Sequence, residues 1–185
     1  MQSRPEEFLR STHVGSLQKL TRYKAWSNEL IFDAVAKLPE SALVAPQPIV
    51  FGNLLRTLNH VLAMDFVWQS HLRGQPHGLT TRNPDSCGTL SEIAQAQADM
   101  NRWYVDYADG LTEAKGDEVV EFIFIGGGPG AMTRADIVLH AVNHGTYHRG
   151  HIAQMMRAWQ APPITDYPVF LKTASYGPAD SQPAR

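Results

Sequence analysis

The sequence predicts an all-α protein, a four-helix bundle with a long crossover and a short β-hairpin before the fourth helix. Three observations predict this fold. Four stretches carry apolar residues at helical spacing. One short run of β-branched and aromatic residues, followed by glycines, lies between the third and fourth stretches. The 185-residue chain has the length of one domain with a substantial core. Four long helices in one domain are typical of a bundle.

The first two helices are expected over residues 12–38 and 53–73. Leucines, alanines and other apolar residues recur at helical spacing in the first stretch, and "PES" ends it. The second stretch reads "NLLRTLNHVLAMDFVWQSHLR", and "GQP" ends it. We therefore expect both helices to bury one apolar face.

The third helix is expected from residue 89 or 91 to about residue 108 or 111, with Thr89 or Ser91 as its N-cap. The fourth is expected over residues 133–159. Its first residues, "TRAD", place an acid three residues after a hydroxyl, which is a variant of the capping box. Pro162 and Pro163 follow its expected end.

The connections are predicted from their turn residues. "EVVEFIFIGGGPGAMT", residues 118–133, indicates a small hairpin or an extended crossover. Its glycines indicate turns rather than a phosphate-binding loop, because no Gly-Lys-Ser/Thr follows them. Residues 74–89 are expected to form a loop, and the tail after residue 175 is expected to be mobile. One domain over 1–185, with a core of about residues 12–160, is the predicted organisation.

Composition excludes several classes of protein. The formal net charge is −2 and no basic cluster occurs, so a nucleic-acid-binding surface is not expected. No apolar run approaches the roughly 20 residues of a membrane span. The start of the chain lacks the pattern of a secretion signal, so we expect a cytoplasmic protein. A single cysteine, Cys87, excludes an internal disulfide and a thiolate metal cage.

The segment "HAVNHGTYHRGH", residues 140–151, holds four of the eight histidines. On a helical wheel, His144 and His148 lie on the apolar face, about 20° to either side of its centre. His140 and His151 lie toward one edge, and Arg149 lies outside the apolar sector. The apolar face itself is formed by Ile137, Ala141, Ile152, Met155 and Trp159.

Two imidazoles buried one turn apart need an explanation. Protonated rings would repel each other, and neutral rings would need several partners in an apolar layer. A divalent cation resolves this, because imidazoles at i and i+4 can converge on one ion. His140, His144 and His148 cannot all bind one ion, because the series spans about 12 Å along the axis. From spacing alone, His144 and His148 are either metal ligands or members of a polar core or proton relay.

A third ligand would have to come from another helix. The second predicted helix offers His60, Asp65 and His71. Asp65 lies near the centre of its apolar arc, so the wheel favours Asp65 for burial, as a ligand or as the partner of a polar group. His60 lies on the shoulder of the arc, and His71, at the helix end, is expected to be solvated. Periodicity leaves the choice open.

Three segments together resemble the DinB family of the DinB/YfiT-like superfamily. They are "YKAWSNELIFDAVAKLPE", "FGNLLRTLNHVLAMDFVWQSHLRG" and "TRADIVLHAVNHGTYHRGHIAQMMR", and the resemblance extends over residues 17–157. Its most specific parts are "HxxxHRG" and the earlier "LxHxxxxDxxW". The resemblance implies a metal triad of His60, His144 and His148, with Asp65 as a supporting carboxylate. His151 departs from the family, which commonly has glutamine there. The resemblance also implies a homodimer.

An ion held by three histidines keeps a coordination position open, which is typical of catalytic sites. It can activate water for hydrolysis or a thiol for transfer. The resemblance implies metal-dependent transferases that use low-molecular-weight thiols such as bacillithiol or mycothiol, together with hydrolases. Our leading hypothesis is a stress or detoxification enzyme that transfers a thiol to an electrophile with a divalent metal ion, Zn, Ni, Mn or Fe.

The candidate catalytic residues are Asp65, Tyr147 and His151, with Arg149 as a further group that could orient a small-molecule substrate. The alternative is a non-catalytic metal-binding or ligand-sensing bundle of the stress response, because Asp65 and His151 are the only clear candidates for a general base. A third interpretation is a bundle with buried histidines and no metal.

Overall fold

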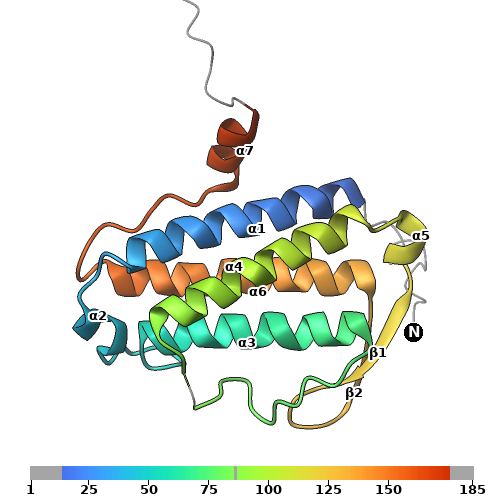
Figure 1. Ribbon diagram of the computed structural model, residues 1–185, viewed down its shortest axis with the longest axis horizontal. Helices are drawn as coiled ribbons and strands as arrows, with labels where there is room; N and C mark the ends of the chain where they lie inside the picture. The colour runs from blue at the N-terminus through green and yellow to red at the C-terminus, as the bar shows by residue number, and fades with distance from the viewer. Residues whose placement is uncertain (1–13, 86, 176–185) are drawn as a thin grey trace, which may run out of the picture.

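Four long helices lie side by side in the computed structural model, which describes residues 14–85 and 87–175 (Figure 1). They are α1 (Val14–Val35), α3 (Leu54–Arg73), α4 (Leu90–Asp109) and α6 (Arg134–Met156). Helices α1 and α3 each pack against α4 and α6, so the ring order is α1–α4–α3–α6. The predicted all-α four-helix bundle is confirmed, and its order around the ring is not the order along the chain. The tail predicted to be mobile lies outside the described residues.

Local signals begin three of the helices where the sequence predicts them, whereas α1 ends at Val35 and not at residue 38. The Asn53 side chain accepts a hydrogen bond from the Arg56 N–H (2.9 Å) and begins α3. Thr89, not Ser91, caps α4, and Glu92 completes a capping box. The hydroxyl of Thr133 accepts from the Asp136 N–H (3.0 Å) and begins α6. These contacts satisfy N–H groups that a helix leaves without partners at its start.

The core consists of two clusters along the bundle axis. One surrounds Tyr104, Trp68 and Ile137, and the other surrounds Leu54 and Ile152. The predicted apolar face of α6 is buried at Ile137, Ala141, Ile152 and Met155. The prediction for Trp159 is wrong, because α6 ends at Met156 and the Trp159 side chain is exposed. A wheel angle has no meaning beyond the last helical residue.

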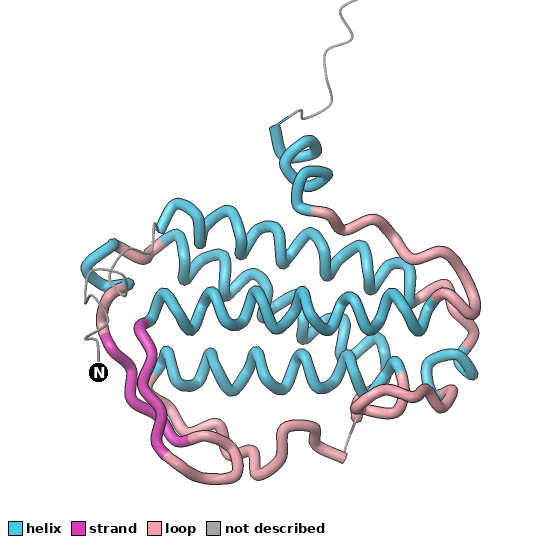
Figure 2. The backbone as a smooth tube through the Cα atoms, turned by 180° about the vertical axis from the view of Figure 1, so that it is seen from behind, coloured by secondary structure: helices cyan, strands magenta, loops and turns pink. Residues whose placement is uncertain are grey.

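The predicted hairpin is present at one end of the bundle, beside α3 (Figure 2). The short helix α5 (Glu113–Gly116) precedes it, and β1 (Val119–Ile123) pairs antiparallel with β2 (Pro129–Thr133). The connecting turn contains Gly126, Gly127 and Gly128 at φ values of 98°, 97° and 91°. Side chains with a Cβ avoid this region, so the glycine run is turn chemistry, as predicted.

Three short helices of the described residues were not predicted: α5 and two others. Helix α2 (Glu40–Val44) follows α1, and α7 (Tyr167–Ser175) packs against α1. The Tyr23 ring of α1 meets the rings of Tyr167 (5.3 Å between centroids) and Phe170 (5.8 Å) edge-on. No helix among the described residues combines the length and the apolar character needed to cross a membrane.

Candidate metal centre

Three imidazoles from two helices converge in the structure. His60 of α3 and His144 and His148 of α6 each offer a ring nitrogen, and these nitrogens lie within 4.8 Å of one another. The Nε2 atoms of His60 and His144 are 3.1 Å apart. Two nitrogens bound to one zinc ion at about 2.0–2.1 Å in tetrahedral geometry lie about 3.3 Å apart, so the spacing fits a shared ion.

The ring of His60 is oriented by its surroundings. Its Nδ1 lies 2.8 Å from the backbone carbonyl of Arg82. A carbonyl only accepts, so Nδ1 carries the proton and Nε2 offers its lone pair toward the cluster. The Phe51 ring stacks on the other side, with 3.9 Å between centroids. The loop after α3 therefore contributes to the site through a main-chain oxygen, which sequence analysis missed because no side chain signals it.

The cluster also contains polar atoms that no protein group satisfies. The Nδ1 atoms of His144 and His148 are buried without a hydrogen-bond partner among the described residues. Buried polar atoms are normally satisfied, and the nitrogen of a metal-binding imidazole that does not bind the ion usually donates to a second group such as a water molecule. The donor set fits a divalent cation that imidazole prefers.

Burial keeps these imidazoles neutral. It lowers the pKa of His144 to about 3, with the neighbouring His148, His60 and His140 adding to the effect. Burial, together with His60 and His151, lowers the pKa of His148 to about 4. The pKa of His60 is also lowered, mainly by burial. Neutral imidazole is the form that binds metal, so the site is ready for an ion at neutral pH.

The cluster opens into a cavity of about 390 Å³ between α3 and α6. His60, Met64, Val67, Trp68 and His71 recur at helical spacing on the α3 wall. The α6 wall carries His140, His144 and His148, and the remaining lining comes from Val50, Phe51, Arg82, Phe124 and Ile125. No Asp or Glu is among these lining residues.

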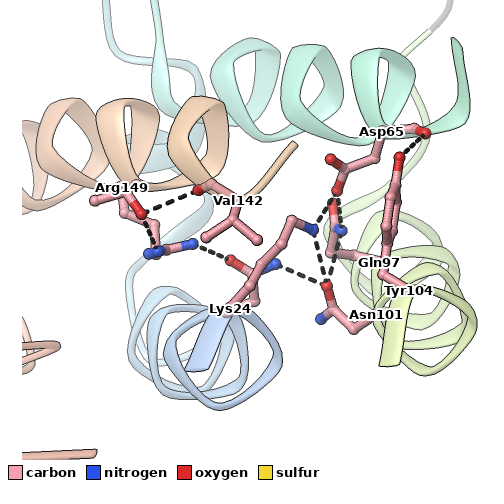
Figure 3. Close-up of polar contacts among 9 residues, drawn as sticks. Lys24, Asp65, Gln97, Asn101, Tyr104, Val142 and Arg149 are labelled. Carbon is pink, nitrogen blue, oxygen red and sulfur yellow. Dashed lines mark hydrogen bonds and ion pairs between the residues drawn. The ribbon is translucent and has the colours of Figure 1, made fainter. Parts of the chain in front are cut away.

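Asp65 lies in the core rather than at the cavity. Its carboxylate pairs with the Lys24 ammonium (2.5 Å) and accepts from the Gln97 amide (2.8 Å), and all three side chains are buried (Figure 3). Burial of Asp65 confirms the wheel, and Lys24 is the polar partner on the first helix. Asp65 is not among the residues that line the cavity.

Tyr147 and His151, the other candidate catalytic residues, are also absent from the cavity lining. The Tyr147 side chain is 63% exposed. Its ring meets that of His151 edge-on, with 4.4 Å between centroids. The structure therefore places the Tyr147 ring beside the rings of His148 (5.0 Å between centroids) and His151, outside the cavity lining. Their proposed roles in catalysis stay predictions.

Two expectations for charged or polar residues are wrong. Arg149, expected outside the apolar sector, is buried and donates to the Asn28 side chain (3.0 Å) and to the Thr146 hydroxyl (2.8 Å). His71, expected in solvent, is half-buried, stacks on Phe122 and lines the cavity. The helical wheel did not predict the burial of Arg149 or His71, because neighbouring elements cover the flanks of α6 and α3 as well as their apolar faces.

His140 and His71 are the two further imidazoles that line the cavity. Burial lowers the pKa of both, and His77 adds to the effect on His71. The ring of His140 meets Trp68 edge-on, with 4.7 Å between centroids. Both are therefore neutral groups at neutral pH, positioned beside the cluster and facing the same space.

Comparison with known proteins identifies the family of this chain. The sequence matches the DinB family over residues 10–183. This chain belongs to the DinB family. It is 28% identical over 179 residues to Protein DinB of Bacillus subtilis (strain 168), which covers 83% of this chain and 92% of that protein.

A solved structure of similar fold is a DinB-like protein from Bacillus cereus ATCC 10987. It has a TM-score of 0.57 and 21% sequence identity, and the match covers 77% of this chain and 91% of that one. At this identity the likeness supports the DinB-like fold, and the histidine geometry described above carries the argument about chemistry.

Proposed function

We propose that this DinB family member is a divalent-metal enzyme that activates a small thiol and transfers it to an electrophile. The observation that carries the proposal is the convergence of His60, His144 and His148 at the end of an accessible cavity. Three protein ligands leave a coordination position free for a substrate, as in catalytic zinc sites. The ion, Zn, Ni, Mn or Fe, would act as the Lewis acid.

The cavity favours thiol transfer over hydrolysis. Hydrolysis usually employs a general base beside the activated water molecule. The lining residues include no carboxylate, and Asp65 is engaged by Lys24, so the candidate bases that line the cavity outside the triad are the imidazoles of His71 and His140. A thiol that binds a metal loses its proton without a separate base. The overall reaction would form a carbon–sulfur bond, release the thiol proton to solvent and expel a leaving group from the electrophile.

The first test is the metal content of protein purified without a nickel column, measured by elemental analysis. We expect about one ion per chain in the wild type and a large loss in His60→Ala and His148→Ala. His77→Ala is the matched control, since His77 is an imidazole outside the cavity lining. Equal metal content in all four proteins would contradict the proposed triad.

The second test is turnover of thiol and 1-chloro-2,4-dinitrobenzene by the metal-loaded protein. His144→Ala should lose most of the rate, while His77→Ala should keep it. A rate that survives in His144→Ala would count against an enzyme that works through this cluster.

The second candidate function is a non-catalytic metal-binding or ligand-sensing bundle of the stress response. It is favoured by one observation, that the cavity lacks a carboxylate to act in proton transfer. Tight metal binding that depends on His60 and His148, without turnover across broad thiol and hydrolase panels, would favour this candidate over the enzyme.

A further inference from the structure

We infer that Arg149 is a positioning residue of the metal centre. It holds the turn of α6 that carries His144 and His148 against α1, so that both imidazoles keep the spacing that one ion requires. This inference rests on the proposed function for the presence of the ion. It goes beyond that function by assigning a role to a buried charged side chain that is not among the residues lining the cavity.

The two metal ligands and Arg149 belong to adjacent rows of side chains on α6. Successive residues of a helix are turned by about 100°, and residues four apart lie on the same face. His144 and His148 form the row that lines the cavity. Gly145 and Arg149, each one residue later, form the next row, and both are buried. Because one turn of helix moves as a unit, a displacement of the second row would also displace the two ligands.

Arg149 connects this turn to α1 through defined contacts. It is 4% exposed, and its guanidinium donates to the side-chain oxygen of Asn28 (3.0 Å) and to the Thr146 hydroxyl (2.8 Å). The guanidinium also lies over the Tyr23 ring, with 5.4 Å to the centroid. Asn28 and Tyr23 belong to α1, and Thr146 belongs to the ligand turn. The planar fork of arginine contacts two acceptors in fixed directions, so it fixes both the distance and the rotation of the turn.

The polar contacts continue from Arg149 to the helix that carries the third ligand. The Asn28 amide donates to Asn101 of α4 (2.9 Å), and Asn101 also accepts from Lys24 (3.2 Å). Lys24 in turn pairs with Asp65 of α3 (Figure 3). The two ligand-bearing helices, α3 and α6, are therefore connected through one buried chain of polar contacts, with Arg149 at its α6 end.

The space beside Gly145 shows how closely this connection packs. A Cβ at residue 145 would lie 3.2 Å from a guanidinium nitrogen of Arg149 and 3.5 Å from Cε of Lys24. The first distance is too short for an ordinary contact, so the guanidinium would have to shift. Gly150 lies on the same helix, and among the described residues a Cβ there would meet open space. Gly145→Ala and Gly150→Ala are therefore a matched pair, because only the first displaces Arg149.

The first experiment measures zinc affinity by competition with a chromophoric chelator. Arg149→Met removes the guanidinium but keeps an unbranched side chain in the core. We expect it to weaken zinc binding about 10–100-fold, since groups that orient metal ligands have effects of this size. Arg149→Lys keeps the charge but loses the fork, so it should also weaken zinc binding.

Arg134→Met is the matched control for the loss of an arginine. Arg134 also lies on α6 and donates to the Leu72 carbonyl (2.8 Å) and to the Tyr107 hydroxyl (3.1 Å), but it lies ten residues before His144. We expect its zinc affinity to remain that of the wild type. Equal weakening in Arg134→Met, or wild-type affinity in folded Arg149 variants, would overturn the inference.

The second experiment uses the glycine pair, which carries the test if the arginine variants fail to fold. Alanine favours a helix over glycine, so both variants should remain folded. In cobalt-substituted protein, Gly145→Ala should change the cobalt d–d absorption band, which reports coordination geometry, and weaken cobalt binding about tenfold. Gly150→Ala should keep the wild-type band and affinity. A Gly145→Ala protein with the wild-type band and affinity would overturn the inference.

Neither experiment measures turnover, so the inference and the proposed function can fail separately. Metal binding that depends on Arg149, without transfer of a thiol, would contradict the proposed enzyme and support the inference. If the wild type binds neither zinc nor cobalt, the proposed function fails, and NMR of metal-free protein tests the position of the rings. The nuclear Overhauser contact between His60 and His144, whose Nε2 atoms are 3.1 Å apart, should then weaken in Arg149→Lys and persist in Arg134→Lys. An unchanged contact in Arg149→Lys would overturn the inference.

Discussion

Lys24 and Asp65 form an ion pair at the centre of the bundle, and its environment explains why both charges are tolerated. Asn101 accepts from the Lys24 ammonium (3.2 Å), and Gln97 donates to the same Asp65 oxygen that Lys24 contacts. Side chains from all four long helices meet in this region, with Arg149 joining from α6 through Asn28 (Figure 3). Burial lowers the pKa of Lys24 while Asp65 acts in the opposite direction. The network thus holds the helices in register through polar contacts rather than apolar ones.

Removing one member of this pair should be strongly destabilising. Lys24→Met leaves the Asp65 charge buried without its cation, which we expect to cost about 3–5 kcal/mol. Replacing both, as Lys24→Met with Asp65→Leu, should recover much of the loss because no lone charge remains. Urea unfolding of the metal-free proteins measures both changes.

The matched control is an exposed ion pair in the same bundle. Arg22 contacts Asp109 through two hydrogen bonds, and both side chains are close to half exposed. Arg22→Met should cost less than about 1 kcal/mol, because solvent screens such pairs. If Lys24→Met costs no more than Arg22→Met, the buried pair is not the structural element described here.

The neutral imidazoles predict how stability depends on pH. The folded-state pKa values of His144 and His148 are about 3 and about 4, below the ordinary value near 6.5. At pH values between the folded-state pKa and the ordinary pKa, the unfolded chain binds more protons than the folded chain. The free energy of unfolding of metal-free protein therefore falls as pH falls from about 6.5. Each imidazole contributes at most about 1.4 kcal/mol per pH unit.

His144→Gln removes one of these groups and should flatten the dependence. Urea unfolding at pH 7, 6 and 5 in the presence of a chelator gives the slope for each protein. A variant whose stability falls in parallel with that of the wild type over this range would show that His144 does not titrate as the structure implies.

At the scale of the elements, most of the bundle could be predicted because its signals are local. Thr133 begins α6, and Gly74, at a φ of 64°, follows the last residue of α3. The starts of these helices and the hairpin need no knowledge of distant residues. Helix α7 was not predicted, and its first turn is held by the Asp166 backbone carbonyl, which accepts from the N–H groups of Val169 and Phe170.

The candidate site was predictable only in part. A helical wheel shows which face of a helix is buried, but it does not show which residues of other helices contact that face. His144 and His148 stood out by spacing, but choosing His60 over Asp65 required the family resemblance. The structure supplies the physical reason, since Asp65 is engaged by Lys24 across the core. The carbonyl of Arg82 and the wall at Phe124 come from loops, whose positions no periodicity encodes.

The N-cap of α4 offers a test at this scale, because the sequence left two candidates. Thr89 accepts from the Glu92 N–H (3.3 Å), and Glu92 accepts from the Thr89 N–H (2.7 Å). Thr89→Ala should therefore lower the free energy of unfolding by about 1 kcal/mol. Ser91→Ala, one residue into the helix, should change it by less than about 0.5 kcal/mol. If urea unfolding shows a larger loss for Ser91→Ala than for Thr89→Ala, the N-cap is Ser91 and not Thr89.

At the scale of the whole molecule, the proposed ion would join two helices that are adjacent in space but far apart in sequence. His60 and His144 are 84 residues apart, and their helices α3 and α6 pack along the cavity. The unfolded chain cannot hold three imidazoles in this arrangement, so the ion would bind mainly to the folded state. An ion with that preference stabilises the fold by about 2.7 kcal/mol at a hundredfold excess over its Kd.

Adding zinc to metal-free protein should therefore raise the melting temperature by several degrees, since about 1 kcal/mol shifts a domain of this size by roughly 2–4 °C. His60→Ala should abolish the shift, because it removes the only ligand that α3 contributes to the triad. His77→Ala should keep it, since that imidazole lies outside the cavity lining. Differential scanning calorimetry over a series of zinc concentrations measures the effect. A shift of equal size in His60→Ala would mean that zinc stabilises the protein at some other place, and that packing rather than a shared ion holds α3 against α6.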